Sequence, residues 1–301
     1  MRLVTFVHKK SQQTGLLLDQ CVLPLGWAVK ESGLDLDVST VLSIVKSPAE
    51  QVQALADLAR RAPDFSSAFL ALKDVQLLAP IPNLSRNVFC VGRNYVDHIK
   101  EGLPGKPTDV ALPEVPQFFT KATHAANSPY GDVRLDASVT RRLDYEVELV
   151  VVIGRSGRDI SREKALDHVF GYCVANDFTA RDLQRRHDQW FKGKSLDTTF
   201  PFGPALVTKD EIININELEI CLRVNGELRQ QASLSQMIFD IPAIIAHLSA
   251  GLTLEAGDII STGTPSGVGY AMTPPQFLQV GDLVESRIEG LGELRNRIVA
   301  A

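Results

Sequence analysis

Two acidic residues stand two positions apart in the apolar run LDYEVELVVVIG, residues 143–154, which is typical of a buried strand. Successive strand side chains point to opposite faces, so Glu146 and Glu148 share one face. The apolar residues Val147 and Leu149 take the other face. Adjacent carboxylates in an apolar environment are costly unless one is protonated or a cation lies between them. A hard cation such as Mg²⁺, Mn²⁺ or Ca²⁺ would satisfy both, and a solvent-exposed acidic strand face is the alternative.

A third acid ends a second apolar run, GYCVAND, residues 171–177. Asp177 stands where a strand usually opens into a loop or cleft, and it could complete an oxygen site of three carboxylates. The remaining positions of such a site are left for water and substrate. The alternative is that Asp177 caps a helix beginning at Thr179, because Asn-Asp before TARDLQ is good capping chemistry.

A histidine and a glutamate stand three positions apart in GRNYVDHIKEG, residues 92–102, which would make them neighbours on one helical face. A carboxylate beside an imidazole raises its basicity and fixes its tautomer, so His98 and Glu101 could form a general acid–base pair. The alternative is a surface pair of little energetic consequence. The segment 102–116 that follows is rich in Pro and Gly, which predicts a lid-like loop over a site.

Two further segments offer groups that could bind an anion. Residues 190–204, WFKGKSLDTTFPFGP, carry Lys192 and Lys194, and either could hold a substrate carboxylate or extend to solvent. Residues 257–269, GDIISTGTPSGVG, form a strand that runs into a Gly-rich loop. There the backbone could approach a small anion and Thr264 adds a hydroxyl, although an ordinary turn-rich connection is the alternative.

The composition argues against several classes of function. The 301 residues are 45% hydrophobic and 22% charged, which predicts a globular protein with a substantial core. The formal net charge of -5 argues against a nucleic-acid partner, which would require a basic stripe. The four cysteines are widely spaced, which indicates reduced thiols rather than disulfides or a zinc site. We find no signal peptide and no membrane-length apolar run, and therefore expect a cytoplasmic protein without a membrane partner.

The elements that must position these residues divide the chain into two parts. Residues 1–75 predict a small N-terminal α+β domain, with short strands at 3–7 and 15–18 and helical apolar spacing over 41–62. Residues 76–301 predict a larger catalytic domain of short β-branched strands separated by turns.

Within this larger domain, Asn225-Gly226 is a strong hairpin signal, and helices are expected at 161–168 and 241–250. Strands outnumber helices and do not alternate regularly with them. The sequence therefore predicts a mixed, β-rich α/β fold rather than a doubly wound parallel sheet.

Six collinear segments together resemble the fumarylacetoacetate hydrolase superfamily. They are VGRNYVDHIKE, LDYEVELVVVIG, VFGYCVANDFTARDLQ, GKSLDTTFPFGP, VNGELRQ and MIFDIPAIIAHLSAGLTLEAGDIISTGTPSGVG. The resemblance covers residues 76–298 and extends to the bacterial branch of acylpyruvate hydrolases, oxaloacetate decarboxylases and hydroxymuconate or oxohepta-dienedioate isomerases. It implies the C-terminal β-roll of the family and a homodimer.

The resemblance also implies roles for particular residues. Glu146, Glu148 and Asp177 match the ligands of Mg²⁺ (or Mn²⁺), and the fourth acidic ligand of some larger relatives is replaced here by the apolar stretch 89–91. The implied catalytic residues are His98 and Glu101, as the lid dyad, and Lys194, as the substrate-binding lysine. The residues implied to bind substrate are Arg181, Gln184, Thr264 and Lys121, the last in FTKATHA, which lacks the proline of the family's F-x-K-P.

A 2-oxo acid can chelate such a metal through its carboxylate and its C2 carbonyl, which stabilises an enolate. The same site would serve a hydrolase, a decarboxylase or an isomerase. Because His98 and Glu101 could activate water, we expect hydrolysis of an acylpyruvate such as fumarylpyruvate. The alternatives are oxaloacetate decarboxylation, isomerisation of 2-hydroxyhepta-2,4-diene-1,7-dioate, and, in another class, a non-catalytic metal-dependent binder of 2-oxo acids.

Overall fold

A computed structural model describes residues 1–103, 105 and 109–301 of the protein. Within these residues, twelve strands form one large mixed sheet. Its strands are β1 (Arg2–His8), β2 (Ser11–Leu18), β3 (Cys21–Pro24), β4 (Leu70–Ala71), β5 (Gln76–Leu77), β6 (Val88–Gly92), β7 (Gln117–Lys121), β8 (Ala126–Asn127), β11 (Val147–Ile153), β12 (Val169–Asn176), β14 (Phe200–Thr208) and β17 (Ile259–Ser261). The main path runs β4-β3-β2-β1-β14-β12-β11-β17-β6-β7.

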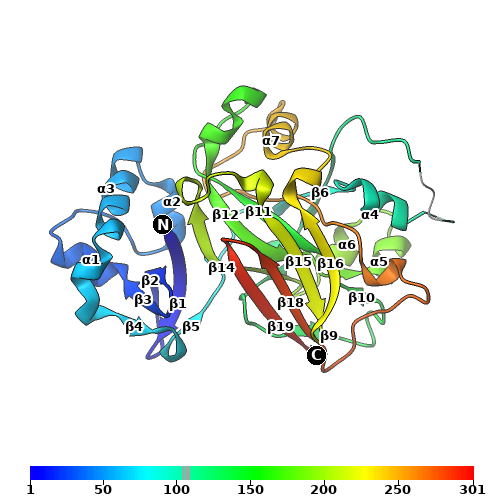
Figure 1. The fold of residues 1–301 in the computed structure, drawn as a ribbon, viewed down its shortest axis with the longest axis horizontal. Coiled ribbons are helices and arrows are strands. Elements are labelled where there is room, and N and C mark those ends of the chain that lie inside the picture. Colours follow the sequence, from blue (N-terminus) through cyan, green and yellow to red (C-terminus); the bar gives the residue numbers. More distant parts are fainter. Residues whose placement is uncertain (104, 106–108) are drawn as a thin grey trace.

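A second sheet packs against the middle of the first (Figure 1). In the order β16-β15-β18-β19-β9, its strands are β16 (Glu227–Ser233), β15 (Glu219–Val224), β18 (Leu283–Ile288), β19 (Gly292–Ala300) and β9 (Val133–Leu135). The short strands β10 (Leu143–Asp144) and β13 (Thr179–Ala180) pair with each other near the site. The mixed, β-rich fold expected from the sequence is confirmed.

The helices are short and lie around these sheets (Figure 1). They are α1 (Leu25–Glu31), α2 (Val41–Lys46), α3 (Ala49–Arg60), α4 (Val96–Glu101), α5 (Arg181–Arg186), α6 (Phe191–Lys194) and α7 (Ile241–Ser249). The 3-10 helices are Ala62–Ala68, Leu72–Asp74, Thr123–Ala125, Arg162–His168, Lys209–Glu211, Ile215–Glu217, Leu234–Gln236 and Gly269–Ala271. In the part of the chain that is described, no helix has the length and apolar character to cross a membrane.

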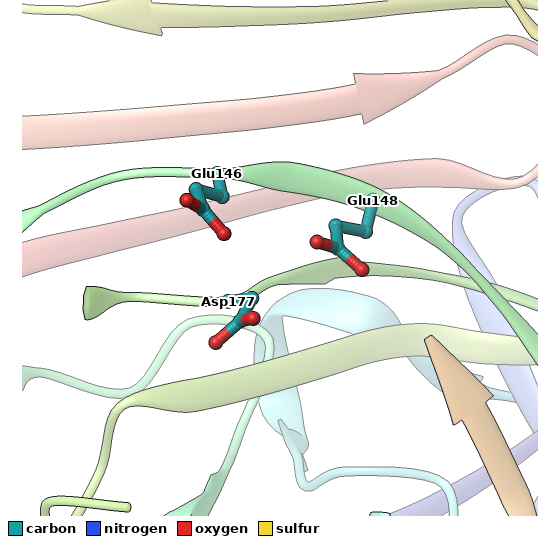
Figure 2. Close-up of side chains that lie close together, drawn as sticks. All are labelled: Glu146, Glu148 and Asp177. Carbon is teal, nitrogen blue, oxygen red and sulfur yellow. The ribbon is translucent and has the colours of Figure 1, made fainter. Parts of the chain in front are cut away.

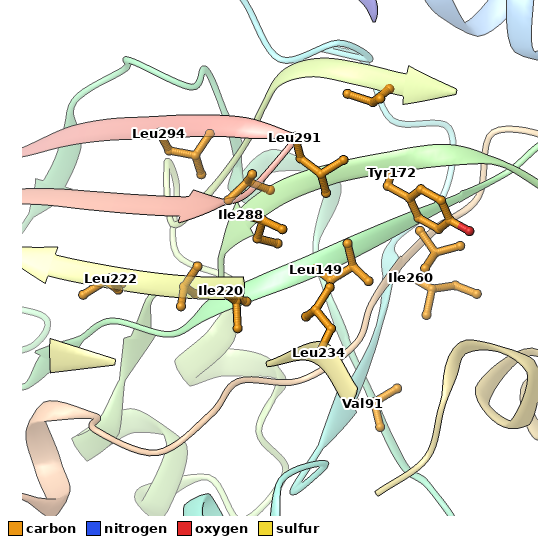
Figure 3. Packing of buried hydrophobic residues seen from close by; sticks show 14 of the residues in the cluster. Val91, Leu149, Tyr172, Ile220, Leu222, Leu234, Ile260, Ile288, Leu291 and Leu294 are labelled. Atoms are coloured by element: carbon orange, nitrogen blue, oxygen red, sulfur yellow. The ribbon is translucent and has the colours of Figure 1, made fainter. Parts of the chain in front are cut away.

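The alternation of side chains along β11 divides the interior into two cores. Leu149 and Val151 point into the core between the two sheets, part of which Figure 3 shows. Val150 and Val152 point into a second core, which the N-terminal helices cover. Every residue of β11 is buried, because sheet neighbours flank it on both sides and a core lies on each face.

The secondary structure predicted from the sequence agrees with the structure at most elements, and it differs at two of the predicted helices. The helical spacing over 41–62 is interrupted at Pro48, which caps the start of α3 after α2 has ended at Lys46. A proline cannot continue a helix that needs its N–H, so two helices share this apolar pattern. The helix expected at 161–168 is a 3-10 helix. The hairpin at Asn225-Gly226 joins β15 to β16 as expected.

The N-terminal strands continue the large sheet, because β1 pairs with β14. Arg2 lies opposite Val207 and Leu3 lies opposite Leu206. Whether residues 1–75 form a separate domain from 76–301 stays a prediction. The expected lid, residues 102–116, includes residues 104 and 106–108, which lie outside the described residues.

Candidate metal and acid–base site

Three buried carboxylates converge at one end of β11 and β12 (Figure 2). One oxygen from each of Glu146, Glu148 and Asp177 lies within 4.8 Å of the others. All three side chains are at most 5% exposed, so the acids do not form a solvent-facing strand surface. The structure thus brings together the three acids that the sequence singled out.

The register of the two strands explains this convergence. Val147 faces Asn176 across the antiparallel pair, and Asp177 follows directly, where its N–H donates to the carbonyl of Glu146 at 2.8 Å. Glu148, in β11, lies two residues beyond Glu146, which directly precedes the strand, so the two side chains point to the same side. The helix α5 begins only at Arg181, and its preceding residue is Ala180, so Asp177 does not cap it.

Three cationic side chains neutralise the cluster. The Nζ of Lys194 lies 2.5 Å from Oε2 of Glu146 and 2.6 Å from Oδ2 of Asp177. The Nζ of Lys121 lies 2.6 Å from Oδ1 of Asp177, and Nη2 of Arg181 lies 2.7 Å from Oε1 of Glu146. Burial by itself would raise the pKa of Glu146, but the charges of Lys194 and Arg181 lower it to about 2.

Glu148 has hydrogen-bond donors but no cationic partner among the described residues. Its Oε2 accepts from the hydroxyl of Ser261 at 2.6 Å and from the N–H of Gly263 at 2.9 Å. Burial, followed by the charges of Asp177 and Glu146, raises the pKa of Glu148 to about 8. Glu148 is therefore the carboxylate of the cluster whose negative charge is least compensated.

These residues fit a divalent cation. The donors are all carboxylate oxygens, which Mg²⁺ and Mn²⁺ prefer over nitrogen or sulfur ligands. Added positive charge would relieve the repulsion that raises the pKa of Glu148. With three residues as ligands, positions for water and substrate would remain.

The histidine and glutamate that the sequence predicts to be neighbours on a helix are in contact in α4. The Nδ1 of His98 lies 2.7 Å from Oε1 of Glu101, and both side chains are mostly buried. The other oxygen of Glu101 accepts from the N–H of Gly267 at 2.8 Å. Gly267 has φ +109, and a Cβ there would lie 1.9 Å from the carbonyl oxygen of Arg229, so this turn requires glycine.

One cavity of about 370 Å³ is lined both by two members of the acid cluster and by the histidine of this pair. Its wall contains Glu146, Glu148, Lys194, His98, Arg181, Gln184, Thr264, Tyr270, Arg93, Arg185, Trp190 and Phe119. Gln184 accepts from Nη1 of Arg181 at 3.2 Å. The hydroxyl of Thr264 donates to the carbonyl of Val147 at 2.9 Å, so it also fixes the Gly-rich loop against β11.

Lys121 is placed differently from the other predicted substrate contacts. Its side chain is fully buried and does not belong to the described cavity wall. Burial lowers the pKa of Lys121 although the charge of Asp177 opposes this shift. Its ammonium also donates to the carbonyl of Phe178 at 3.1 Å. The other expected lysine, Lys194, lies on the wall.

Sequence reasoning missed several residues of this site. Asp144 is fully buried next to Arg181, and Arg93 and Arg185 lie on the cavity wall. A signal for Asp144 was present, because it precedes Glu146 by the same two-residue interval that separates Glu146 from Glu148. The two arginines come from segments about ninety residues apart in the chain, so their common position on the wall depends on tertiary packing, which local spacing does not reveal.

Comparisons with known proteins find relatives over most of this chain. A family model described as fumarylacetoacetate (FAA) hydrolase C-terminal matches residues 87–299. The chain is 52% identical over 245 residues to oxaloacetate tautomerase YisK of Bacillus subtilis, covering 81% of this chain and 80% of that one.

Solved structures show the same likeness. A fumarylacetoacetate hydrolase from Exiguobacterium antarcticum is 38% identical with a TM-score of 0.81, and both chains are covered completely. A maleylpyruvate hydrolase from Sphingobium sp. SYK-6, solved with manganese(II) and pyruvate, is 28% identical with a TM-score of 0.78, also over the full length of both chains.

Proposed function

The chain belongs to the fumarylacetoacetate hydrolase family, and on that premise we propose that it is a metal-dependent enzyme that interconverts the enol and keto forms of oxaloacetate. The observation that carries this proposal is the cavity whose wall holds Glu146 and Glu148 of the acid cluster together with His98, which is paired with Glu101. Such an enzyme must bind a 2-oxo acid and move one proton, and it needs no attacking water. The similarity to an oxaloacetate tautomerase supports this reaction over the acylpyruvate hydrolysis expected first.

Glu146, Glu148 and Asp177 would hold Mg²⁺ or Mn²⁺. When bound, this cation would supply Lewis-acid stabilisation of the enolate form of the substrate. Lys194 and Arg181 lie on the cavity wall beside Glu146, where they would orient the carboxylate of the substrate.

His98, held by Glu101, would carry out the proton transfer. In the enol-to-keto direction, the enolic hydroxyl loses a proton and C3 gains one, so the reaction is balanced without a co-reactant. His98 would exchange the proton at C3, because its Nδ1 is held by Glu101 and its side chain lies on the cavity wall. Glu101 is in turn fixed by the N–H of Gly267.

The charge of the cavity supports a dicarboxylate substrate. Arg93 and Arg185 lie on the wall and have no carboxylate partner in an ion pair within the described part of the chain. Each guanidinium instead lies near an aromatic ring, 5.9 Å from Trp190 for Arg93 and 5.8 Å from Tyr270 for Arg185. Cations placed in this way can bind the second carboxylate of oxaloacetate.

To test this proposal, freshly dissolved enol oxaloacetate is mixed with the protein and added Mg²⁺ or Mn²⁺, and the enol absorbance is followed over time. We expect faster loss of enol absorbance than in buffer with metal alone, with no matching formation of pyruvate. Formation of pyruvate at the rate of enol loss would instead indicate decarboxylation. Tight binding of oxaloacetate without either change would indicate a non-catalytic binder.

Hydrolysis of an acylpyruvate is the second candidate function. It is favoured by the structural similarity to a maleylpyruvate hydrolase, together with a histidine–glutamate pair that could take a proton from water. The same assay with fumarylpyruvate and acetylpyruvate distinguishes the two, because only hydrolysis releases pyruvate and a second acid. Isomerisation of 2-hydroxyhepta-2,4-diene-1,7-dioate belongs in the same panel.

We also propose a homodimer, as the family resemblance implies, and light scattering after size-exclusion chromatography tests it. The cytoplasmic location stays a prediction from the sequence.

A further inference from the structure

A fourth buried carboxylate adjoins the site without belonging to the acid cluster. Asp144 is fully buried at the end of β10, and its two oxygens accept four hydrogen bonds. Oδ1 accepts from the N–H of Tyr145 at 3.0 Å and of Gly269 at 2.8 Å. Oδ2 accepts from the N–H of Tyr270 at 3.1 Å and from Nε of Arg181 at 2.8 Å. A buried carboxylate with this many donors is rigidly held and fixes each donor in return.

Two of the three backbone donors belong to the loop that supports the acid–base pair. Gly269 and Tyr270 follow Gly267, whose N–H donates to Oε2 of Glu101. The hydroxyl of Tyr145, the neighbour of Asp144, donates to the carbonyl of Gly267 at 3.1 Å. The pair 144–145 therefore anchors both ends of the turn that orients Glu101.

The side-chain donor belongs to the substrate-binding wall. Arg181 bridges Asp144 through Nε and Glu146 through Nη2, at 2.8 and 2.7 Å. Its guanidinium lies 4.4 Å from the ring centre of Tyr270, on the loop that Asp144 also anchors. The two carboxylates and the tyrosine ring together fix the orientation of the Arg181 guanidinium relative to the acid cluster.

We propose that Asp144 is a positioning residue that fixes Arg181 and the His98–Glu101 pair relative to each other and to the acid cluster. This inference rests on the proposed function only for its kinetic part. Asp144 itself does not belong to the described cavity wall, so it acts through the residues it holds.

The main variant is Asp144→Asn, which keeps the shape but replaces one accepting oxygen by an amide nitrogen and removes the charge. The matched control is Asp258→Asn. Asp258 is also buried, accepts from the N–H of Glu255 at 2.8 Å and pairs with Arg86 at 2.8 Å, but it does not belong to the described cavity wall.

Amide hydrogen exchange measured by mass spectrometry tests the positioning without any activity assay. For Asp144→Asn we expect faster exchange in peptides that cover 263–271 and 96–101, and for Asp258→Asn no change in either. Unchanged exchange in both peptides of Asp144→Asn would overturn the proposal. This outcome is independent of whether oxaloacetate is the substrate.

Steady-state kinetics provide the second test. Asp144→Asn should raise KM through Arg181 and lower kcat through the acid–base pair, with about a tenfold to hundredfold loss of kcat/KM, as expected for a lost bond to a charged group. Arg181→Lys should act mainly on KM. Tyr145→Phe, which removes only the hydroxyl that donates to Gly267 of the loop, should act mainly on kcat, and it also serves as the milder variant if Asp144→Asn does not fold.

The binding of Mn²⁺, followed by the electron paramagnetic resonance signal of the free ion, separates positioning from loss of the cluster. We expect Asp144→Asn to bind Mn²⁺ with an affinity close to that of the parent protein. Loss of Mn²⁺ binding in parallel with activity, or an identical kinetic pattern for Tyr145→Phe and Arg181→Lys, would refute a positioning role. If the parent protein does not turn over oxaloacetate, the proposed function fails while the exchange experiment still decides the role of Asp144.

Discussion

The ammonium group of Lys121 lies 2.6 Å from Oδ1 of Asp177, and both side chains are fully buried. The second oxygen of Asp177 accepts from Lys194 at 2.6 Å, so this carboxylate holds one lysine on the cavity wall and one behind it. A buried ion pair contributes little net stability compared with apolar residues, but removing one partner leaves an uncompensated charge. The orientation of Asp177 toward Glu146 therefore depends on Lys121.

Replacing Lys121 tests this dependence. Lys121→Met should lower the free energy of unfolding by about 3 to 5 kcal/mol, because Oδ1 of Asp177 loses its buried cation. Urea denaturation measures this change. Lys192→Met is the matched control, since Lys192 is exposed and should leave stability nearly unchanged. A normal stability combined with a raised KM would instead indicate that Lys121 contacts substrate.

Glu148 offers the cleanest removal of a proposed metal ligand. Because burial and two neighbouring acids raise its pKa to about 8, its charge is unfavourable in the metal-free protein. Glu148→Gln should therefore keep or increase stability without metal, while Mn²⁺ binding and activity are both lost. Alanine at Glu146 or Asp177 should also abolish both, but Glu146→Ala removes one partner of Arg181 and of Lys194, and Asp177→Ala leaves Lys121 without its ion-pair partner. Full activity of the parent protein after treatment with a chelator would contradict a metal requirement.

His98→Ala should reduce turnover by about two to four orders of magnitude, the usual contribution of general acid–base catalysis. Binding of Mn²⁺ should persist, because His98 is not among the three clustered acids. Rates are measured separately for oxaloacetate and for an acylpyruvate. If the variant loses activity only with the acylpyruvate, the histidine serves only to activate water. If the rates with both substrates are unchanged, His98 has no role in catalysis.

The turn at Gly267 should be intolerant of a side chain. Gly267→Ala places a Cβ 1.9 Å from the carbonyl oxygen of Arg229, so the loop must shift and the N–H can no longer reach Glu101 in the same geometry. We expect lower kcat as well as lower stability. Gly251→Ala is the control, since Gly251 has φ +74 but open space around its Cβ position. Thermal unfolding and kinetics of both variants separate backbone strain from the loss of alignment.

Strand periodicity alone was enough to predict that Glu146 and Glu148 share a face, because alternation is a property of the backbone. The approach of Asp177 depends on the register between β11 and β12, which local sequence does not encode. Asp144 was missed for a similar reason: three of its four donors come from residues more than thirty positions away. The sequence shows a proline at position 48, but the helical apolar spacing continues on both sides of it. The spacing therefore predicts a single helix where the structure has two.

The pairing of β1 with β14 has a consequence for any attempt to isolate the part of the chain that carries the site. A chain beginning at residue 76 would lose β1, so the part of β14 around Leu206 and Val207 would become an open edge with unpaired N–H and C=O groups, although β8 still pairs with the start of β14. Edges of this kind recruit strands from other molecules. The first 75 residues thus protect the sheet from self-association as well as covering its second core.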